Sequence, residues 1–168
     1  MTASSAEFWH AGVRLAYRTQ GVGPLLLILP GNTASSAHHG GELAYFGARF
    51  CAIAPDFAGT GQSDRLRMWP DDWHQRCAHD LAALVAHLGE RQCLVMGTSG
   101  GAIIALWLAI LHPEIVCAVV ADSTVAAFPP AWLHAAMDTR SARSPGQIDF
   151  WRAAHGDDWA QVIDQDTA

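Results

Sequence analysis

Short runs of apolar residues recur along this chain, separated by segments with a different pattern. Leu25–Leu29 is apolar at every position, which is typical of a strand that helices cover on both faces. Comparable runs lie at Phe50–Ala54, Cys93–Met96 and Ile115–Val120. We therefore expect four buried strands along the chain, with other elements between them.

The segments around these runs predict two helices and a further pair of strands. Between Pro70 and Gly89, apolar residues recur at intervals of three and four, which predicts an amphipathic helix with Pro70 in its first turn and Gly89 at its end. Ala102–Leu111 is apolar throughout and predicts a buried helix. Val13–Arg18 alternates loosely between two faces and, with Phe8–Trp9, predicts a short strand pair near the start.

Strands and helices in this order predict an α/β fold with a mostly parallel, doubly wound sheet, because parallel strands need crossover connections. In open sheets of this kind, ligands bind beyond the carboxyl ends of the strands. We therefore expect chemistry in the loops that follow Leu29, Ala54, Met96 and Ala121. The length of 168 residues suits one domain with a sizeable core.

Composition and charge exclude several classes of partner. With 51% hydrophobic and 15% charged residues, the chain is typical of a globular protein. Its formal net charge is −6 and no segment clusters Lys and Arg, so we expect no nucleic-acid binding. The longest apolar run, Ala102–Leu111, is about half of the ~20 residues that a membrane span needs, so we expect no membrane span.

The cysteines and histidines predict neither disulfides nor a bound metal. The four cysteines are widely spaced and the first residues lack the pattern of a signal peptide, so we expect reduced thiols in a cytoplasmic protein. The histidines lack ligand spacing with a carboxylate or cysteine partner. No Gly-x-Gly-x-x-Gly follows a predicted strand, so we expect no organic cofactor either.

The strongest chemical signal is Gly97-Thr98-Ser99-Gly100-Gly101, which lies between the strand Cys93–Met96 and the helix Ala102–Leu111. It matches the Gly-x-Ser-x-Gly nucleophile elbow, in the strand–turn–helix context that this motif requires. Glycine is needed two positions before and after the serine, because side chains there would collide with neighbouring backbone. The helix N-terminus supplies free N–H groups for a developing anion. The alternative is a turn that only connects, or one that holds a phosphate.

A second candidate is Pro30-Gly31-Asn32, directly after the strand Leu25–Leu29. An acyl-transfer site needs two N–H donors for the oxyanion, one from the residue after the nucleophile and one from this earlier loop. Gly100 and Asn32 are the candidates, each through its backbone N–H. The alternative is an ordinary turn with Asn32 as a helix cap. A third segment, Asp56–Asp64, predicts a tight, self-bonded loop without chemistry of its own.

These three segments, in this order, resemble the α/β-hydrolase family and, within it, the cap-bearing esterases, lactonases and related members. The usual pattern is a His-Gly-x oxyanion loop, an Asp-x-x-Gly-x-Gly-x-Ser loop and then the elbow. Pro30 stands where histidine is usual, which the backbone N–H tolerates. The resemblance covers Phe8–Asp122. It implies that residues 1–122 form the N-terminal part of the core, without the last strands of the sheet, and that 123–168 begin a helical cap.

By this resemblance, Ser99 is the nucleophile of a serine hydrolase that cleaves small carboxylic esters or lactones through an acyl-enzyme. Asp122 is a candidate acid, and the alternative is a cap on the following turn. Asp164 and Asp166 are less favoured as acids because they are close to the chain end. Chain order in the family is nucleophile, acid, histidine, so the base is expected beyond the end of this chain. Eight of the nine histidines are candidates for the base, and none of these eight is favoured: His38, His39, His74, His79, His87, His112, His134 and His155.

The cap and the sheet edge carry further expectations. Pro129-Pro130 would begin a helical stretch, and three tryptophans would be apolar anchors of a lid, Trp132, Trp151 and Trp159. A sheet that stops after Val120 would expose an apolar edge, which predicts a homodimer through that edge. The alternative to an enzyme is a fragment that keeps the elbow as a scaffold and binds a ligand or partner without catalysis.

Overall fold

The computed structural model describes residues 2–125, 127 and 129–167. Residues 1, 126, 128 and 168, which belong to the predicted core and cap segments, lie outside this description. The strands are β1 Ser4–His10, β2 Val13–Gln20, β3 Leu25–Leu29, β4 Cys51–Pro55, β5 Cys93–Thr98 and β6 Val116–Asp122. The helices are η1 Ser36–His39, α1 Gly40–Phe46, α2 Trp73–His87, α3 Gly100–Leu111, α4 Pro130–Ser141, α5 Pro145–His155 and α6 Trp159–Thr167.

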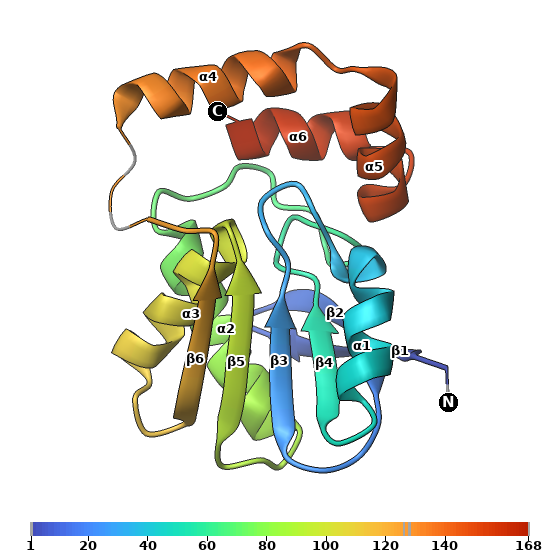
Figure 1. The fold of residues 1–168 in the computed structure, drawn as a ribbon, viewed down its shortest axis with the longest axis vertical. Helices are drawn as coiled ribbons and strands as arrows, with labels where there is room; N and C mark the ends of the chain where they lie inside the picture. The colour runs from blue at the N-terminus through green and yellow to red at the C-terminus, as the bar shows by residue number, and fades with distance from the viewer. Residues whose placement is uncertain (1, 126, 128, 168) are drawn as a thin grey trace.

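The six strands form one sheet in the order β1-β2-β4-β3-β5-β6 (Figure 1). β3 pairs in parallel with β4 and β5, and β5 pairs in parallel with β6. The first two strands form an antiparallel hairpin, and β2 also runs antiparallel to β4. The turn between β1 and β2 consists of Ala11 and Gly12, whose φ values are 49° and 81°, as a tight hairpin turn requires. The predicted mostly parallel sheet is therefore confirmed.

Helices cover both faces of the sheet, as doubly wound topology demands. α2 and α3 pack together on one face, where Leu27 and Val95 join Leu84 and Leu108 in the larger core cluster. On the other face α1 contributes Leu43 to a smaller cluster (Figure 1). β3 is buried at all five positions because it lies between these two layers. The run of apolar residues thus predicted its environment correctly.

Two features of the helices differ from the sequence-based expectation. α2 begins at Trp73 rather than at Pro70, whose carbonyl instead accepts the Trp73 N–H over 2.9 Å in the preceding turn. The expected stop is confirmed, because Gly89 has φ of 76° just after the helix. The short elements η1 and α1 were not predicted, since four and seven residues hold too few turns for a periodic signal.

The last three helices lie above the carboxyl ends of the parallel strands (Figure 1). Trp151 of α5 stacks on Trp159 of α6, with ring centroids 5.7 Å apart, and both are buried. Trp132 is 59% exposed, so its expected role as an apolar anchor is wrong. The reason is that α4 buries none of its residues in the described part of the chain.

The β6 edge of the sheet carries exposed apolar side chains. Val120 of β6 is 59% exposed, and Ile110 of the adjacent α3 is 66% exposed. In the order of the six described strands, β6 has a neighbour on one side only.

None of the described helices has the length and apolar character that a membrane span needs.

Two leucines of α3 test which helix face stabilises the fold. Leu108 is fully buried in the larger cluster, whereas Leu106 is 43% exposed. We expect Leu108→Ala to lower the free energy of unfolding by about 2–5 kcal/mol, because it leaves a cavity against the sheet. Leu106→Ala should change it by about 0.5 kcal/mol or less. Urea unfolding measures both, and equal losses would contradict the assigned orientation of α3.

Candidate active site

Ser99 lies on a strained turn between β5 and α3. Its φ and ψ are 54° and −120°, a conformation that a residue with a side chain adopts only where the surroundings enforce it. The Ser99 N–H donates to the Asp122 carbonyl over 2.9 Å, and its own carbonyl accepts the Ala102 N–H over 3.0 Å. These bonds hold the turn while the residue itself stays exposed. The geometry is that of a nucleophile elbow.

The glycines around Ser99 are required by backbone crowding, as the sequence predicted. A β-carbon on Gly97 would lie 2.3 Å from the Gly101 carbonyl oxygen. A β-carbon on Gly101 would lie 2.4 Å from the carbonyl oxygens of both Leu29 and Pro30. No real β-carbon tolerates such distances, so the elbow helix can approach the sheet this closely only without side chains.

The backbones of Gly100 and Asn32 lie close together beside the elbow. A β-carbon on Gly100 would lie 3.1 Å from the Asn32 backbone nitrogen and would overlap the Asn32 side-chain amide. Gly31 brings the two segments together, since its own β-carbon would be 3.3 Å from the Ser99 β-carbon. Neither amide donates to a protein acceptor within the described residues. The structure thus brings Asn32, Ser99 and Gly100 together, with two unused donors beside the serine.

Asp122 ends β6 directly opposite Thr98 in the parallel ladder. Its carbonyl holds the Ser99 N–H, so its backbone belongs to the elbow. The Asp122 residue is exposed, and its carboxylate makes no ion pair with a described residue. The alternative of a capping carboxylate has no support, because no described N–H donates to it.

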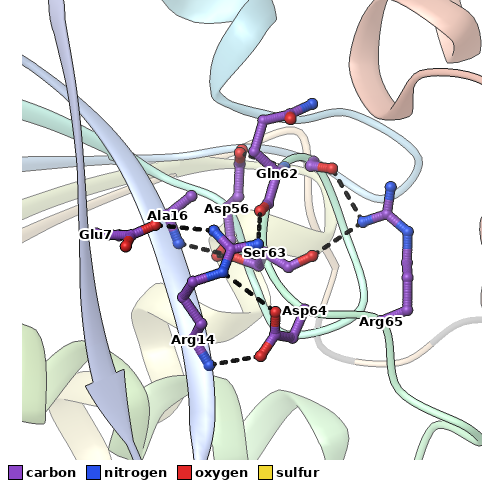
Figure 2. Close-up of polar contacts among 9 residues, drawn as sticks. Glu7, Arg14, Ala16, Asp56, Gln62, Ser63, Asp64 and Arg65 are labelled. Atoms are coloured by element: carbon purple, nitrogen blue, oxygen red, sulfur yellow. Dashed lines mark hydrogen bonds and ion pairs between the residues drawn. The ribbon is translucent and has the colours of Figure 1, made fainter.

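The Asp56–Asp64 loop is self-bonded, as expected. The buried Asp56 carboxylate accepts the N–H of Ser36 over 2.7 Å and that of Gln62 over 2.8 Å. Burial raises the pKa of Asp56, and these two donors act in the opposite direction. Ser63 Oγ donates to the Asp56 carbonyl and accepts the N–H of Ala16, which ties the loop to β2 (Figure 2).

A histidine from the last three helices, α4 to α6, which we call the cap, connects two of these loops. His155, at the end of α5, is 2% exposed. The Gly61 N–H donates to its Nδ1 over 3.0 Å, and its Nε2 lies 3.1 Å from the Thr33 carbonyl oxygen. Because an N–H can only donate and a carbonyl only accept, the ring is neutral with its proton on Nε2. Burial lowers the pKa of His155 to about 4. Neither nitrogen is free to take a proton from Ser99.

Arg65 reinforces this junction between loop and cap. It donates to the carbonyls of Gly61, Ser63 and His155 over 2.8–3.1 Å. It also forms a two-point ion pair with Asp158, at 2.7 and 2.9 Å, which lowers the pKa of that carboxyl. Figure 2 shows Arg65 reaching back to the loop. Sequence reasoning missed Arg65 and His155, since no local pattern marks a contact between residues about 90 positions apart.

Several of the remaining histidines and acids contact residues other than Ser99. His38 stacks on Phe150 with ring centroids 3.9 Å apart, and His79 bonds His112 over 2.9 Å. Asp164 pairs with Arg143, and Asp166 pairs with Arg140 over 2.6 Å. Burial raises the pKa of Asp166 to about 6, although Arg140 opposes this. Across the described chain no histidine hydrogen-bonds Ser99, and no three His, Cys, Asp or Glu side chains converge as metal ligands.

Comparison with known proteins agrees with this geometry. A family model for the alpha/beta hydrolase fold matches residues 24–167. The chain therefore belongs to the α/β-hydrolase fold family.

Its relatives include named hydrolases. The 2-(acetamidomethylene)succinate hydrolase of Mesorhizobium japonicum is 32% identical over 133 residues, which are 78% of this chain and 45% of that protein. A crystal structure of E-2-(acetamidomethylene)succinate hydrolase has a TM-score of 0.76 at 28% identity, covering 84% of this chain and 52% of the other. An epoxide hydrolase from an endophytic Streptomyces has a TM-score of 0.66 at 30% identity, covering 70% and 36%. The chain spans 30–45% of the length of the first curated relatives that it matches.

Two glycine substitutions test the crowding at the elbow. Gly101→Ala should lower the free energy of unfolding by about 1–3 kcal/mol or more, because the new methyl group meets two backbone carbonyls. Gly146→Ala is the matched control, since nothing lies within 4 Å of a β-carbon there. It should be neutral or stabilising by up to about 1 kcal/mol. Urea denaturation compares the two, and similar values would contradict the close approach of elbow and sheet.

Proposed function

We propose that the complete protein is a serine hydrolase in which Ser99 forms an acyl-enzyme. The observation that carries this proposal is the pair of unused amides, on Asn32 and Gly100, beside a serine held on a strained turn. Ser99 Oγ attacks the substrate carbonyl carbon, and the two N–H groups bind the oxyanion that forms. Collapse of that intermediate expels the alcohol, and water then releases the acid and restores the serine.

The substrate in this proposal is a small carboxylic ester or lactone. A serine oxygen that forms an acyl-enzyme needs a carbonyl carbon, and two amides beside it suit the oxygen of that carbonyl. This favours a carbonyl substrate over an epoxide, the substrate class named by several structural relatives. The relatives named for 2-(acetamidomethylene)succinate hydrolysis support chemistry at a carbonyl centre.

The acid and the base complete the proposal. Asp122 is the candidate acid, because it ends the strand next to the elbow and its carboxylate has no described partner. For the base we propose a histidine in a part of the complete protein outside this chain. Both nitrogens of His155 are occupied, and chain order in this family places the histidine last. That histidine would take the Ser99 proton during attack and return it to the leaving alcohol.

A second candidate function is binding without turnover. The observation in its favour is that Ser99 Oγ has no histidine partner among the residues described. A serine hydroxyl without a general base is a weak nucleophile. In that case the elbow and its two amides would bind an anionic or carbonyl ligand as a scaffold.

Labelling with a fluorophosphonate separates the two functions. We expect the complete protein, which would include the proposed base, to gain one phosphonyl group, read by intact mass, and its Ser99→Ala variant to gain none. Ser141→Ala, a substitution on the exposed helix α4, should label like the unchanged protein. Labelling that persists in Ser99→Ala would contradict Ser99 as the nucleophile. No labelling of a complete protein that circular dichroism shows to be folded would favour binding without turnover.

We also propose that this chain forms a homodimer through the β6 edge. An edge strand with exposed apolar side chains is a template for pairing with a second copy. Val120 is 59% exposed on that strand, and Val22, 81% exposed in the turn before β3, is a control outside the edge strand, because β5 lies between β3 and β6.

Val120→Lys should convert the dimer to a monomer in size-exclusion chromatography with light scattering, because a buried lysine at the new interface would lose its water. Val22→Lys should remain dimeric. A monomer already in the unchanged chain would refute the homodimer.

A cytoplasmic location stays a prediction, with which the four free thiols agree.

A further inference from the structure

The turn that presents Asn32 is not stable by itself. It closes with a bond from the Ala34 N–H to the Gly31 carbonyl over 3.1 Å. Within it, Thr33 has φ of 65°, in the left-handed region that residues with a β-carbon rarely adopt. A turn with such a residue persists only when its surroundings hold it. The orientation of the Asn32 amide therefore depends on what contacts this turn.

Two buried side chains hold the segment that contains this turn. Asp56 accepts the Ser36 N–H at its far end, over 2.7 Å. His155 binds the Thr33 carbonyl oxygen, one residue from the Asn32 amide, over 3.1 Å. Asp56 comes from the core, but His155 comes from the cap helix α5. The cap thus contacts the strained residue itself.

His155 is in turn fixed on its other side. Its Nδ1 accepts the N–H of Gly61, and its carbonyl accepts from Arg65, which also pairs with Asp158 beyond the end of α5. A ring held at both nitrogens cannot rotate without breaking a buried hydrogen bond. Hydrogen bonds therefore connect Asp158 and Arg65, through His155, to the strained residue Thr33.

We propose that His155 is a positioning residue for the oxyanion site: by holding the Thr33 carbonyl, it orients the Asn32 amide and makes that orientation depend on a seated cap. This inference rests on the proposed function, in which the Asn32 N–H stabilises the oxyanion. It assigns His155 no proton transfer and no contact with substrate. A residue that merely fills buried space would not have this effect.

Two amide substitutions separate positioning from space filling. In His155→Gln the side-chain amide nitrogen reaches the place of Nε2 and can still donate to Thr33. In His155→Asn the amide oxygen takes the place of Nδ1 and can accept from Gly61, but the side chain is too short to reach Thr33. Each variant therefore keeps one of the two hydrogen bonds.

We expect His155→Asn to slow fluorophosphonate labelling of Ser99 about tenfold or more, because a misplaced oxyanion donor loses most of its effect. His155→Gln should label within about threefold of the unchanged chain, since it keeps the bond to Thr33. In ¹H–¹⁵N spectra, the Asn32 amide signal should shift in His155→Asn and stay near its place in His155→Gln. Thermal unfolding of both variants shows whether a loss of overall stability explains either result.

Equal labelling by the two variants, or an Asn32 signal that responds to both alike, would overturn the positioning role. If the unchanged chain does not label at all, the proposed function fails for this chain, and the Asn32 signals alone decide the positioning role. If neither variant folds, long-range ¹H–¹⁵N spectra of the unchanged protein decide, because a proton on Nδ1 instead of Nε2 of His155 would exclude the bond to Thr33.

Discussion

The site depends on the close contact of three backbone segments, which glycines make possible. A β-carbon on Gly101 would meet the carbonyls of Leu29 and Pro30, and one on Gly31 would meet the Thr98 carbonyl and the Ser99 β-carbon. Because glycines stand at these contacts, the distance between the serine and the Asn32 amide follows from the path of the backbone. Such a site is preorganised, which is what stabilisation of a developing charge requires.

The cap is joined to this arrangement through a connected set of polar contacts. A connected set of hydrogen bonds joins the end of α5 to the Asp56–Asp64 loop, through Arg65, His155 and Asp158. Buried polar groups that are fully paired favour one geometry, because any displacement leaves a donor or acceptor without water. The cap helix α4 has no such junction and buries no residue among those described. The cap therefore contacts the core through α5 and α6, next to the turn that contains Asn32 and Thr33.

Much of the core could be predicted because its signals are local. The uniformly apolar Leu25–Leu29 indicated a strand covered on both faces, and the glycines of Gly97–Gly101 indicated a crowded turn with a serine. The predictions for the start of α2 and for the burial of Trp132 were wrong, because in each case the same sequence pattern is compatible with two structures. Pro70 suits a helix start or the turn before one, and the turn before the helix is what forms. An exposed Trp132 on α4 has the same sequence signature as a buried one.

The sequence by itself determined the order of elements, the crowded turn with Ser99 and the Pro-Gly-Asn turn with Asn32, because each arises from neighbours along the chain. Only the tertiary structure decided what holds them. His155 binds Gly61 and Thr33 across 94 and 122 positions, and it is buried, neutral and fully bonded only because the cap folds back over the strand ends. Hydrophobic periodicity reports the environment of one element at a time, so a contact between distant polar residues has no trace in it.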